Sequence, residues 1–357
     1  MAQLKAGSTA GGITIKSVAG PWTYSDMDFA AGVGVTEGYI KKSGTDEFEL
    51  VATSNGAVKT PTQGTVAAFT SGGATTPSAS TAVIDKFPFS SPFTTAASAG
   101  SLSQARFWIA GQSSTIEGFS AGGYTALSTI DKFPFSSPFT TAASAGSLSQ
   151  ARAGASGQSS MTEGFSSGSY NGTGADTIRD KFPFTAPFTT ATLLGDLLQS
   201  RYNSSGQSSA TDGFISGGTT TTAVTRIDKF PFSAPVSAAT ISAGNLSQAR
   251  RQAAGQSSST EGFTSGGSIP TGFSTTIDKF PFLASFTTAT SVGSLSQTRQ
   301  GGMGQSTTTA GYTSGGDAGP GAYYTTIDKF PFTTPFTTAT SVGSLSQGRS
   351  GGTGQQY

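Results

Sequence analysis

The chain has 357 residues, of which 49 are glycine and 11% are charged, and its formal net charge is +1. A chain this close to neutral lacks the basic surface of nucleic-acid-binding proteins and is not attracted to an anionic membrane. It contains no Cys and no His, which excludes disulfides, Cys or His metal ligands, thiol nucleophiles and the commonest general base.

The polar residues favour strands and turns, because they are mostly Ser, Thr and Gln instead of the Glu, Lys and Arg that cover exposed helix faces. No apolar run reaches the roughly 18 residues of a membrane-spanning helix, so we expect no membrane insertion. The opening residues, MAQLKAGSTAGGITI, lack the apolar core of a secretory signal. We therefore expect the protein to be made in a cytoplasm.

Residues 1–62 do not carry the repeat that fills the rest of the chain. The stretches GGITIKSV and DEFELVATS predict short strands within them. A segment of about sixty residues barely buries a core of its own. We therefore predict a small β-rich segment that anchors the chain to a larger assembly.

Residues 63–357 consist of a repeat with a period of 46–50 residues. Each copy has the string DKFPF, an Arg 21 or 22 residues after its Asp, and then Gly-Gln. The aspartates are Asp85, Asp131, Asp180, Asp228, Asp278 and Asp328. The arginines are Arg106, Arg152, Arg201, Arg250, Arg299 and Arg349.

The repeat predicts an all-β fold, because it has no 3.6-residue apolar rhythm and its period fits four short strands. We expect strands through GFTSGG, TTIDKFPF, FTTATSVGSL and the segment around SQTR and GQS. In the DKFPF strand, Asp and both Phe share one face, which we place in the core. Pro cannot donate to a ladder, which places this strand at a sheet edge or on a bulge.

The two ends of the repeat predict a closed ring. The last copy stops just after its Gly-Gln, and the first is preceded at 63–73 by QGTVAAFTSGG, a spare strand of the type that the last copy lacks. The N-terminal strand can therefore complete the C-terminal blade and leave no open edge. We predict a six-bladed β-propeller over residues 63–357.

The Gly pair, the aromatic-rich strand after it and the later Arg resemble the kelch group of propellers over residues 63–357. The motifs SGG, IDKFPF, L-x-x-x-R and GQSS resemble kelch-like repeats in proteins of marine tailed phages more closely, and LKAGSTAGG resembles the start of tail-fibre and other virion proteins. The resemblance implies a virion surface protein, either a tail fibre or spike or a head decoration. Its partners would be other virion proteins, through residues 1–62, and a host-surface glycan or protein. The alternative is a cellular kelch-type scaffold for protein–protein contacts.

We interpret the repeated Asp and Arg as structural, because a residue needed once per blade recurs with the blade; the alternative is a set of ligands around a central channel. Four carboxylates also recur before the Gly-aromatic step, at Glu117, Glu163, Asp212 and Glu261. Blade rotation separates them, whereas a glycosidase needs two carboxylates within about 5–10 Å. We therefore expect no enzyme, no cofactor and no metal site.

The segment between the small-residue pair and DKFPF is the one part of the repeat that varies in length, and repeats place such loops on a single face. Aromatic and amide side chains there suit sugar or protein surfaces, although drift in unconstrained loops would also produce them. The candidate ligand-contacting residues are Tyr124, Tyr170, Asn171, Phe273, Tyr323 and Tyr324. The four residues after each Arg vary at constant length, and Phe107 and Trp108 there would contact the N-terminal segment or belong to the core.

Overall fold

The computed structural model describes residues 63–90, 92–185, 187–233, 240–333 and 335–357, together with five short strands before residue 54. The chain divides into two compact units, residues 1–60 and 61–357. Throughout the described part all regular structure is β-strand, and it holds no helix that is long and apolar enough to cross a membrane.

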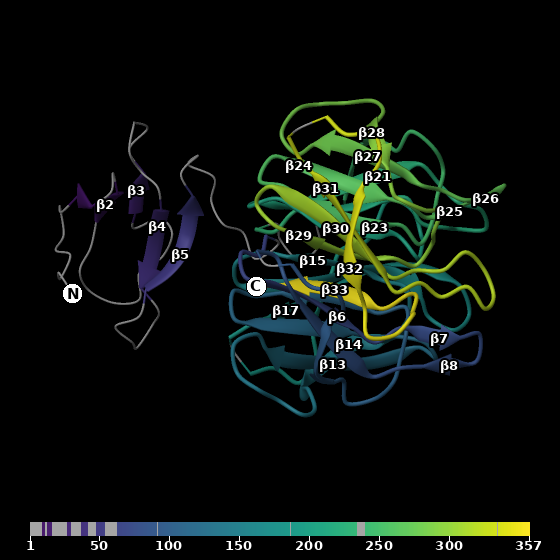
Figure 1. Ribbon diagram of the computed structural model, residues 1–357, viewed down its shortest axis with the longest axis horizontal. Helices are drawn as coiled ribbons and strands as arrows, with labels where there is room; N and C mark the ends of the chain where they lie inside the picture. Colours follow the sequence, from purple (N-terminus) through teal and green to yellow (C-terminus); the bar gives the residue numbers. More distant parts are fainter. Residues whose placement is uncertain are drawn as a thin grey trace. The chain divides into compact units, whose positions relative to one another are not determined.

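The first unit contains two small antiparallel sheets (Figure 1). One sheet is formed by β1 (Thr9–Ala10), β2 (Ile13–Ile15) and β3 (Met27–Phe29). The other is a hairpin of β4 (Glu37–Lys41) and β5 (Phe48–Thr53). The strands predicted in GGITIKSV and DEFELVATS correspond to β2 and β5.

The second unit is a six-bladed β-propeller of four-stranded antiparallel sheets (Figure 1). From the innermost strand outward, the first blade is β33 (Thr353–Gln356), β6 (Ala67–Ser71), β9 (Val83–Pro88) and β10 (Ala97–Ser101). The second is β11 (Ala110–Ser113), β12 (Glu117–Ala121), β13 (Leu127–Pro134) and β14 (Ala143–Arg152). The third is β15 (Ser156–Ser159), β16 (Glu163–Tyr170), β17 (Ala175–Pro183) and β18 (Thr192–Leu194).

The other three blades follow the same order of strands. The fourth blade is β19 (Ser205–Ser208), β20 (Asp212–Ser216), β21 (Arg226–Pro231) and β22 (Ile241–Asn245). The fifth is β23 (Ala254–Ser257), β24 (Glu261–Ser265), β27 (Thr276–Pro281) and β28 (Thr290–Ser294). The sixth is β29 (Met303–Ser306), β30 (Ala310–Ser314), β31 (Thr326–Pro331) and β32 (Thr340–Ser344). Two hairpins lie in loops: β7 (Ala74–Thr76) with β8 (Ala79–Ser80), and β25 (Ser268–Ile269) with β26 (Gly272–Phe273).

The predicted ring closure is confirmed. β33 pairs with β6 from Thr353 opposite Ser71 to Gln356 opposite Ala68, so the first blade takes its innermost strand from the C-terminus. The blade is offset from the sequence repeat by one strand. The Gly-Gln strand, expected as the last strand of a unit, is the innermost strand of the following blade and pairs with the Gly-aromatic strand after it.

Of the two positions expected for the DKFPF strand, the sheet edge is wrong, whereas an irregularity of the bulge type is found: the register between β13 and β14 shifts between Ile130 and Asp131. β13 is the third of four strands and pairs on both sides. Its proline, Pro134, is the last residue of the strand and has a register partner only in β12, because the pairing with β14 reaches no further than Lys132. The missing N–H therefore falls where the outer ladder has already ended.

The hydrophobic core lies between neighbouring blades, and both Phe of each DKFPF belong to it. Phe119 of the second blade, for example, lies with its ring centroid 5.6 Å from that of Phe182 and 4.9 Å from that of Phe184 in the third blade. The same contact occurs at every boundary, with Tyr312 in the place of Phe at the last one. Each blade therefore completes its core on the next, which stabilises the closed ring.

Candidate functional site

The innermost strands approach one another so closely around the axis that only glycine fits at one position in each. A Cβ atom on Gly157 would overlap with the carbonyl oxygen of Gly111, and the same relation links each Gly-Gln glycine from Gly157 to Gly354 with the one before it. The ring of glycines brings backbone against backbone along the central channel. The glycine of the Gly-Gln motif therefore serves packing around the axis.

The glutamine of the same motif ties each blade to the next. Its side-chain nitrogen donates a hydrogen bond to the backbone carbonyl of the aromatic residue in the following blade, as from Gln112 to Phe165 at 2.9 Å. The other five bonds join Gln158 to Phe214, Gln207 to Phe263, Gln256 to Tyr312, Gln305 to Phe69, and Gln355 to Phe119. The last of these bonds joins the C-terminal strand to the second blade, so the set also closes in a circle.

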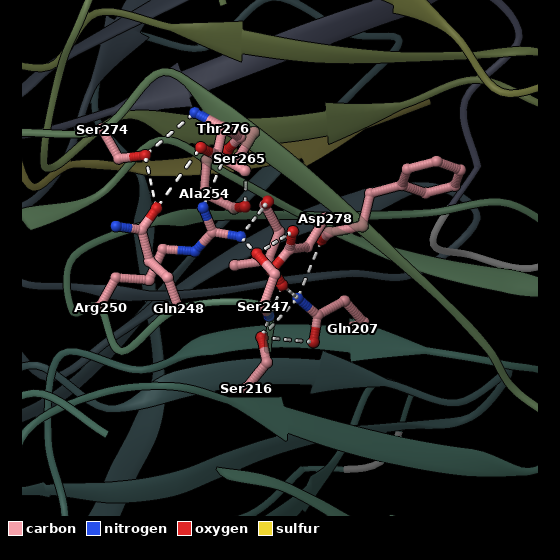
Figure 2. Close-up of polar contacts among 12 residues, drawn as sticks. Gln207, Ser216, Ser247, Gln248, Arg250, Ala254, Ser265, Ser274, Thr276 and Asp278 are labelled. Atoms are coloured by element: carbon pink, nitrogen blue, oxygen red, sulfur yellow. Dashed lines mark hydrogen bonds and ion pairs between the residues drawn. The ribbon is translucent and has the colours of Figure 1, made fainter. Parts of the chain in front are cut away.

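The repeated Arg and Asp form six buried ion pairs, and each Arg pairs with the Asp of the following copy. Arg250 lies 2.7 Å from Asp278, and both side chains are fully buried. Arg250 also donates to the carbonyl oxygens of Thr276 and Thr264, so it joins two strands of the fifth blade (Figure 2). The other pairs are Arg106 with Asp131, Arg152 with Asp180, Arg201 with Asp228, Arg299 with Asp328, and Arg349 with Asp85.

Each buried carboxylate needs more than one donor to offset the loss of water. Ser247 supplies two of them to Asp278, from its backbone N–H and its hydroxyl, at 2.8 and 2.7 Å (Figure 2). Burial lowers the pKa of the Arg250 guanidinium, and the charge of Asp278 acts in the opposite direction. None of these twelve Asp and Arg residues lines the central channel. The geometry therefore gives no support to the alternative of channel ligands.

The four carboxylates that precede the Gly-aromatic step lie on four different blades. Each forms an ion pair with the Lys of the DKFPF strand beside it, as between Glu261 and Lys279 at 2.8 Å. These pairs are partly exposed to solvent. Among the described residues, no three Asp or Glu side chains come together in a group that could hold a metal ion.

The variable loops and the four-residue segments after each Arg lie side by side at one end of the channel. Tyr170 is bridged to Ala153, and Tyr124 donates its backbone N–H to Phe107 at 2.8 Å. The opposite end carries the turns that follow the innermost strands and the loops that follow DKFPF. We call the first end, with its variable loops and four-residue segments, the loop face.

The six candidate ligand-contacting residues all belong to the loop face, but they are spread over four blades. Tyr124 is 44% exposed and lies with Phe107 and Trp108 in a cluster with ring centroids 4.9–5.5 Å apart. Tyr170 lies 5.5 Å from Tyr202 of the fourth blade.

The side chains of the other four candidates are partly occupied by contacts within the chain or partly buried. Asn171 accepts hydrogen bonds from its own turn, at Thr173 and Gly174. Phe273 and Tyr323 are half-buried, and burial raises the pKa of the Tyr323 phenol. Tyr324 packs over the guanidinium of Arg299 at 5.7 Å. The ring-to-ring contacts of the loop face therefore form two groups, one at the second blade and one between the third and fourth blades, and Phe273, Tyr323 and Tyr324 belong to neither.

A ring of six backbone hydrogen bonds surrounds the channel at the loop face. Each is donated by the second residue after a repeated Arg to the equivalent residue of the preceding blade, at 2.5–2.8 Å. The residues are Trp108, Gly154, Asn203, Gln252, Gly301 and Gly351, and all six have positive φ angles. A side chain in this region costs roughly 1–2 kcal/mol, with Asn the best tolerated. The backbone geometry of the ring therefore favours glycine at every one of its six positions.

Three blades nevertheless place a side chain in this ring: Trp108 at φ 56°, Asn203 at 54° and Gln252 at 52°. All three line the channel, which holds about 150 Å³ of open space. From the sequence the role of Trp108 stayed open, and Asn203 and Gln252 were not among the predicted residues. The signal was present, because the second of the four variable residues is Gly in the other three copies.

No protein-family model matches the chain, and no curated protein matches it in sequence. By contrast, 181 chains of solved structures match its fold. One of these, described as "Structure of YjhT", is 12% identical, with a TM-score of 0.59, over 71% of this chain and 88% of that chain. At this level of identity the likeness concerns the fold alone, and it supports the six-bladed β-propeller.

Proposed function

We propose that this chain is a surface protein of a tailed-phage particle, a tail fibre, spike or head decoration, that acts by binding and catalyses no reaction. The propeller is its displayed part, and residues 1–62 are the part that contacts other virion proteins. The kelch-like motifs SGG, IDKFPF and GQSS, together with the opening LKAGSTAGG, support the assignment to a virion. The ligand is a glycan or a protein on the host surface.

The observation that carries this proposal is that repeated residues hold the blades together, whereas non-repeated residues lie on the loop face. The repeated Arg, Asp and Gln are occupied in holding blades together, and the repeated Arg and Asp are buried. The residues that differ between copies gather on the loop face, where aromatic side chains such as Tyr124 are exposed. A rigid ring that presents non-repeated aromatic and amide side chains on one face suits recognition of a surface.

The first test measures binding of the labelled full-length protein to a panel of intact marine bacterial cells. A variant with Tyr124→Ala, Tyr170→Ala and Tyr202→Ala removes one exposed and two half-buried rings of the loop face. We expect it to lose binding. Leu283→Ser is the matched control, since Leu283 is 85% exposed in the loop that follows DKFPF, at the opposite end of the channel. Equal binding by the triple variant would contradict the role of the loop face.

The second test locates the protein. Antibodies against the propeller should label purified phage particles in immunogold electron microscopy, and deletion of residues 1–60 should abolish incorporation while circular dichroism still reports a folded β-protein. Labelling of no particle, together with stable complexes with cellular proteins, would replace the virion proposal with the cellular kelch-type scaffold.

A further inference from the structure

The channel at the loop face holds three side chains at ring positions where the backbone favours glycine. Trp108, Asn203 and Gln252 have φ angles of 52–56°, whereas Gly301 and Gly351 occupy equivalent positions at 62° and 65°. Strained residues of this kind persist where their side chains have a use. The backbone ring itself needs none of these side chains, because the glycine copies make the same hydrogen bond.

The side chains lie along the rim of the channel, above the glycines of neighbouring blades. A Cβ atom on Gly351 would lie 2.9 Å from Cδ1 of Trp108, and one on Gly154 would lie 2.5 Å from Oδ1 of Asn203. At these two positions glycine in one blade makes room for the side chain of the next, whereas Gln252 follows Asn203. The mixture of glycine and larger residues produces an uneven rim.

Polar groups at this rim are available to a ligand. No hydrogen bond within the described residues involves the side-chain amides of Asn203 or Gln252. Both residues line the channel.

The chemistry of the lining selects the class of ligand. The residues that line the channel include Trp, Asn, Gln, Ser and many Gly, and none is Asp, Glu, Lys or Arg. An anionic ligand would find no counter-charge there. An indole ring offers an apolar face to the C–H face of a sugar ring, and amides pair with neighbouring hydroxyls. A space of this order holds a single six-membered ring in other proteins.

We infer that the channel at the loop face binds the terminal neutral pyranose of a glycan. Trp108 stacks on the sugar ring, and the amides of Asn203 and Gln252 form hydrogen bonds with its hydroxyls. This inference rests on the proposed function, that the propeller acts by binding, and it adds the site and the class of ligand.

The test uses the full-length protein and a panel of methyl glycosides of glucose, galactose, mannose and N-acetylglucosamine, with sialic acid and galacturonic acid as acidic probes. Saturation-transfer NMR and calorimetry measure binding. We expect one or more neutral glycosides to bind and neither acidic probe to do so. Because a hydrogen bond or a stacked ring contributes modestly, we expect Asn203→Gly and Gln252→Gly to weaken binding by about threefold to tenfold each, and Trp108→Gly by about tenfold or more.

Glycine is the informative substitution because it restores the residue that the backbone favours. We expect Asn203→Gly and Gln252→Gly to melt at the wild-type temperature or above it, which separates loss of binding from loss of folding. Trp108→Phe, which keeps an aromatic ring, should retain part of the affinity. Ala126→Gly is the matched control, since Ala126 also has a positive φ angle but does not line the channel, and it should bind the glycosides as wild type does.

Three results would overturn the inference. They are no binding of any neutral glycoside by the wild-type protein, preference for an acidic probe, or an affinity of all three glycine variants equal to that of the wild-type protein. Cell binding in the previous assay distinguishes this failure from failure of the proposed function. If the wild-type protein binds cells but no sugar of the panel, the loop face recognises a different ligand, such as a protein, and the proposed function stands without this site.

Discussion

Five of the six boundaries between neighbouring blades hold their buried aspartate with the same donors, and the boundary between the third and fourth blades does not. At the five regular boundaries the Ser three residues before the repeated Arg donates its N–H and hydroxyl to the carboxylate, as Ser247 does to Asp278. The others are Ser103, Ser149, Ser296 and Ser346. At the irregular boundary Leu198 occupies the serine position, and Arg226 Nε donates to Asp228 at 2.6 Å.

The difference teaches that a boundary does not require the serine donors. At the irregular boundary Asp228 Oδ2 accepts no hydrogen bond among the described residues, and the carboxylate is held by its ion pairs with Arg201 and Arg226. Arg179 replaces the usual Ile before the Asp and stacks on the ring of Phe230 at 4.7 Å. Burial lowers the pKa of both Arg179 and Arg201 to about 10, and the charge of Asp228 acts against that shift in each. Asp228 therefore serves three arginines.

A large effect is expected at the axis, where the innermost strands of neighbouring blades pack backbone to backbone. Gly206→Ala should lower the free energy of unfolding by about 2–4 kcal/mol, because the new Cβ overlaps with the backbone of Gly157 and neither strand can move without shifting the ring. Urea denaturation followed by circular dichroism measures the change.

The control is Gly174→Ala, at a glycine with ordinary φ and open space around its Cβ position. It should change stability by less than about 0.5 kcal/mol. A Gly206→Ala variant as stable as this control would mean that the innermost strands are not packed backbone to backbone.

The next effect compares the two types of boundary. Asp278→Ala leaves Arg250 buried without its counter-charge and should destabilise by about 3–5 kcal/mol. Asp228→Ala should cost more than this, because it leaves Arg201 and Arg226 close together without the carboxylate that they share and removes the second of the two carboxylates, after Asp196, that act on Arg179. Chemical denaturation of both variants gives the order.

Glu261→Ala provides the baseline, since its ion pair with Lys279 is partly exposed and such pairs contribute at most about 1 kcal/mol. If Asp228→Ala were the milder of the two buried substitutions, the additional arginines would have to be neutral or hydrated in the folded protein.

The sequence was sufficient for the architecture because the evidence for it is repeated six times. The DKFPF string predicted a buried Asp-Phe-Phe face, and the spare strand at 63–73 predicted the pairing of β6 with β33. The position of the strand within the sheet was not predictable from its Pro. A proline is also tolerated at the end of an inner strand, and the sequence does not show where the neighbouring ladder stops.

The candidate site was only partly visible in the sequence. Length variation indicated the loop face and its aromatic residues, such as Tyr124. Length variation did not indicate that Asn203 and Gln252 line the channel. The reason is that their positive φ angles are a property of the backbone, which cannot be inferred from the type of side chain. The pairing of each Arg with the next Asp was hidden for a similar reason, since residue spacing does not reveal which blade the Arg faces.

The smallest expected effect tests whether donors can be exchanged between the two types of boundary. Arg226→Thr introduces the residue found at the equivalent position in three other blades, as at Thr276, and removes one donor from Asp228. We expect a loss of about 1 kcal/mol, because a hydrogen bond to a carboxylate disappears while the repulsion between Arg226 and Arg201 is relieved. Leu198→Ser alone should be nearly neutral, since Leu198 is 48% exposed and Asp228 keeps its ion pairs with Arg201 and Arg226.

The double variant Leu198→Ser with Arg226→Thr recreates a regular boundary. If the serine N–H and hydroxyl bind Asp228 as Ser247 binds Asp278, stability should return to within about 0.5 kcal/mol of wild type, and the double-mutant cycle should give a coupling of about 1 kcal/mol. A double variant no more stable than Arg226→Thr would show that the path of the chain at residue 198, where the backbone N–H donates to Thr240, keeps the serine away from the carboxylate. The irregular boundary would then differ from the others in backbone conformation as well as in its donors.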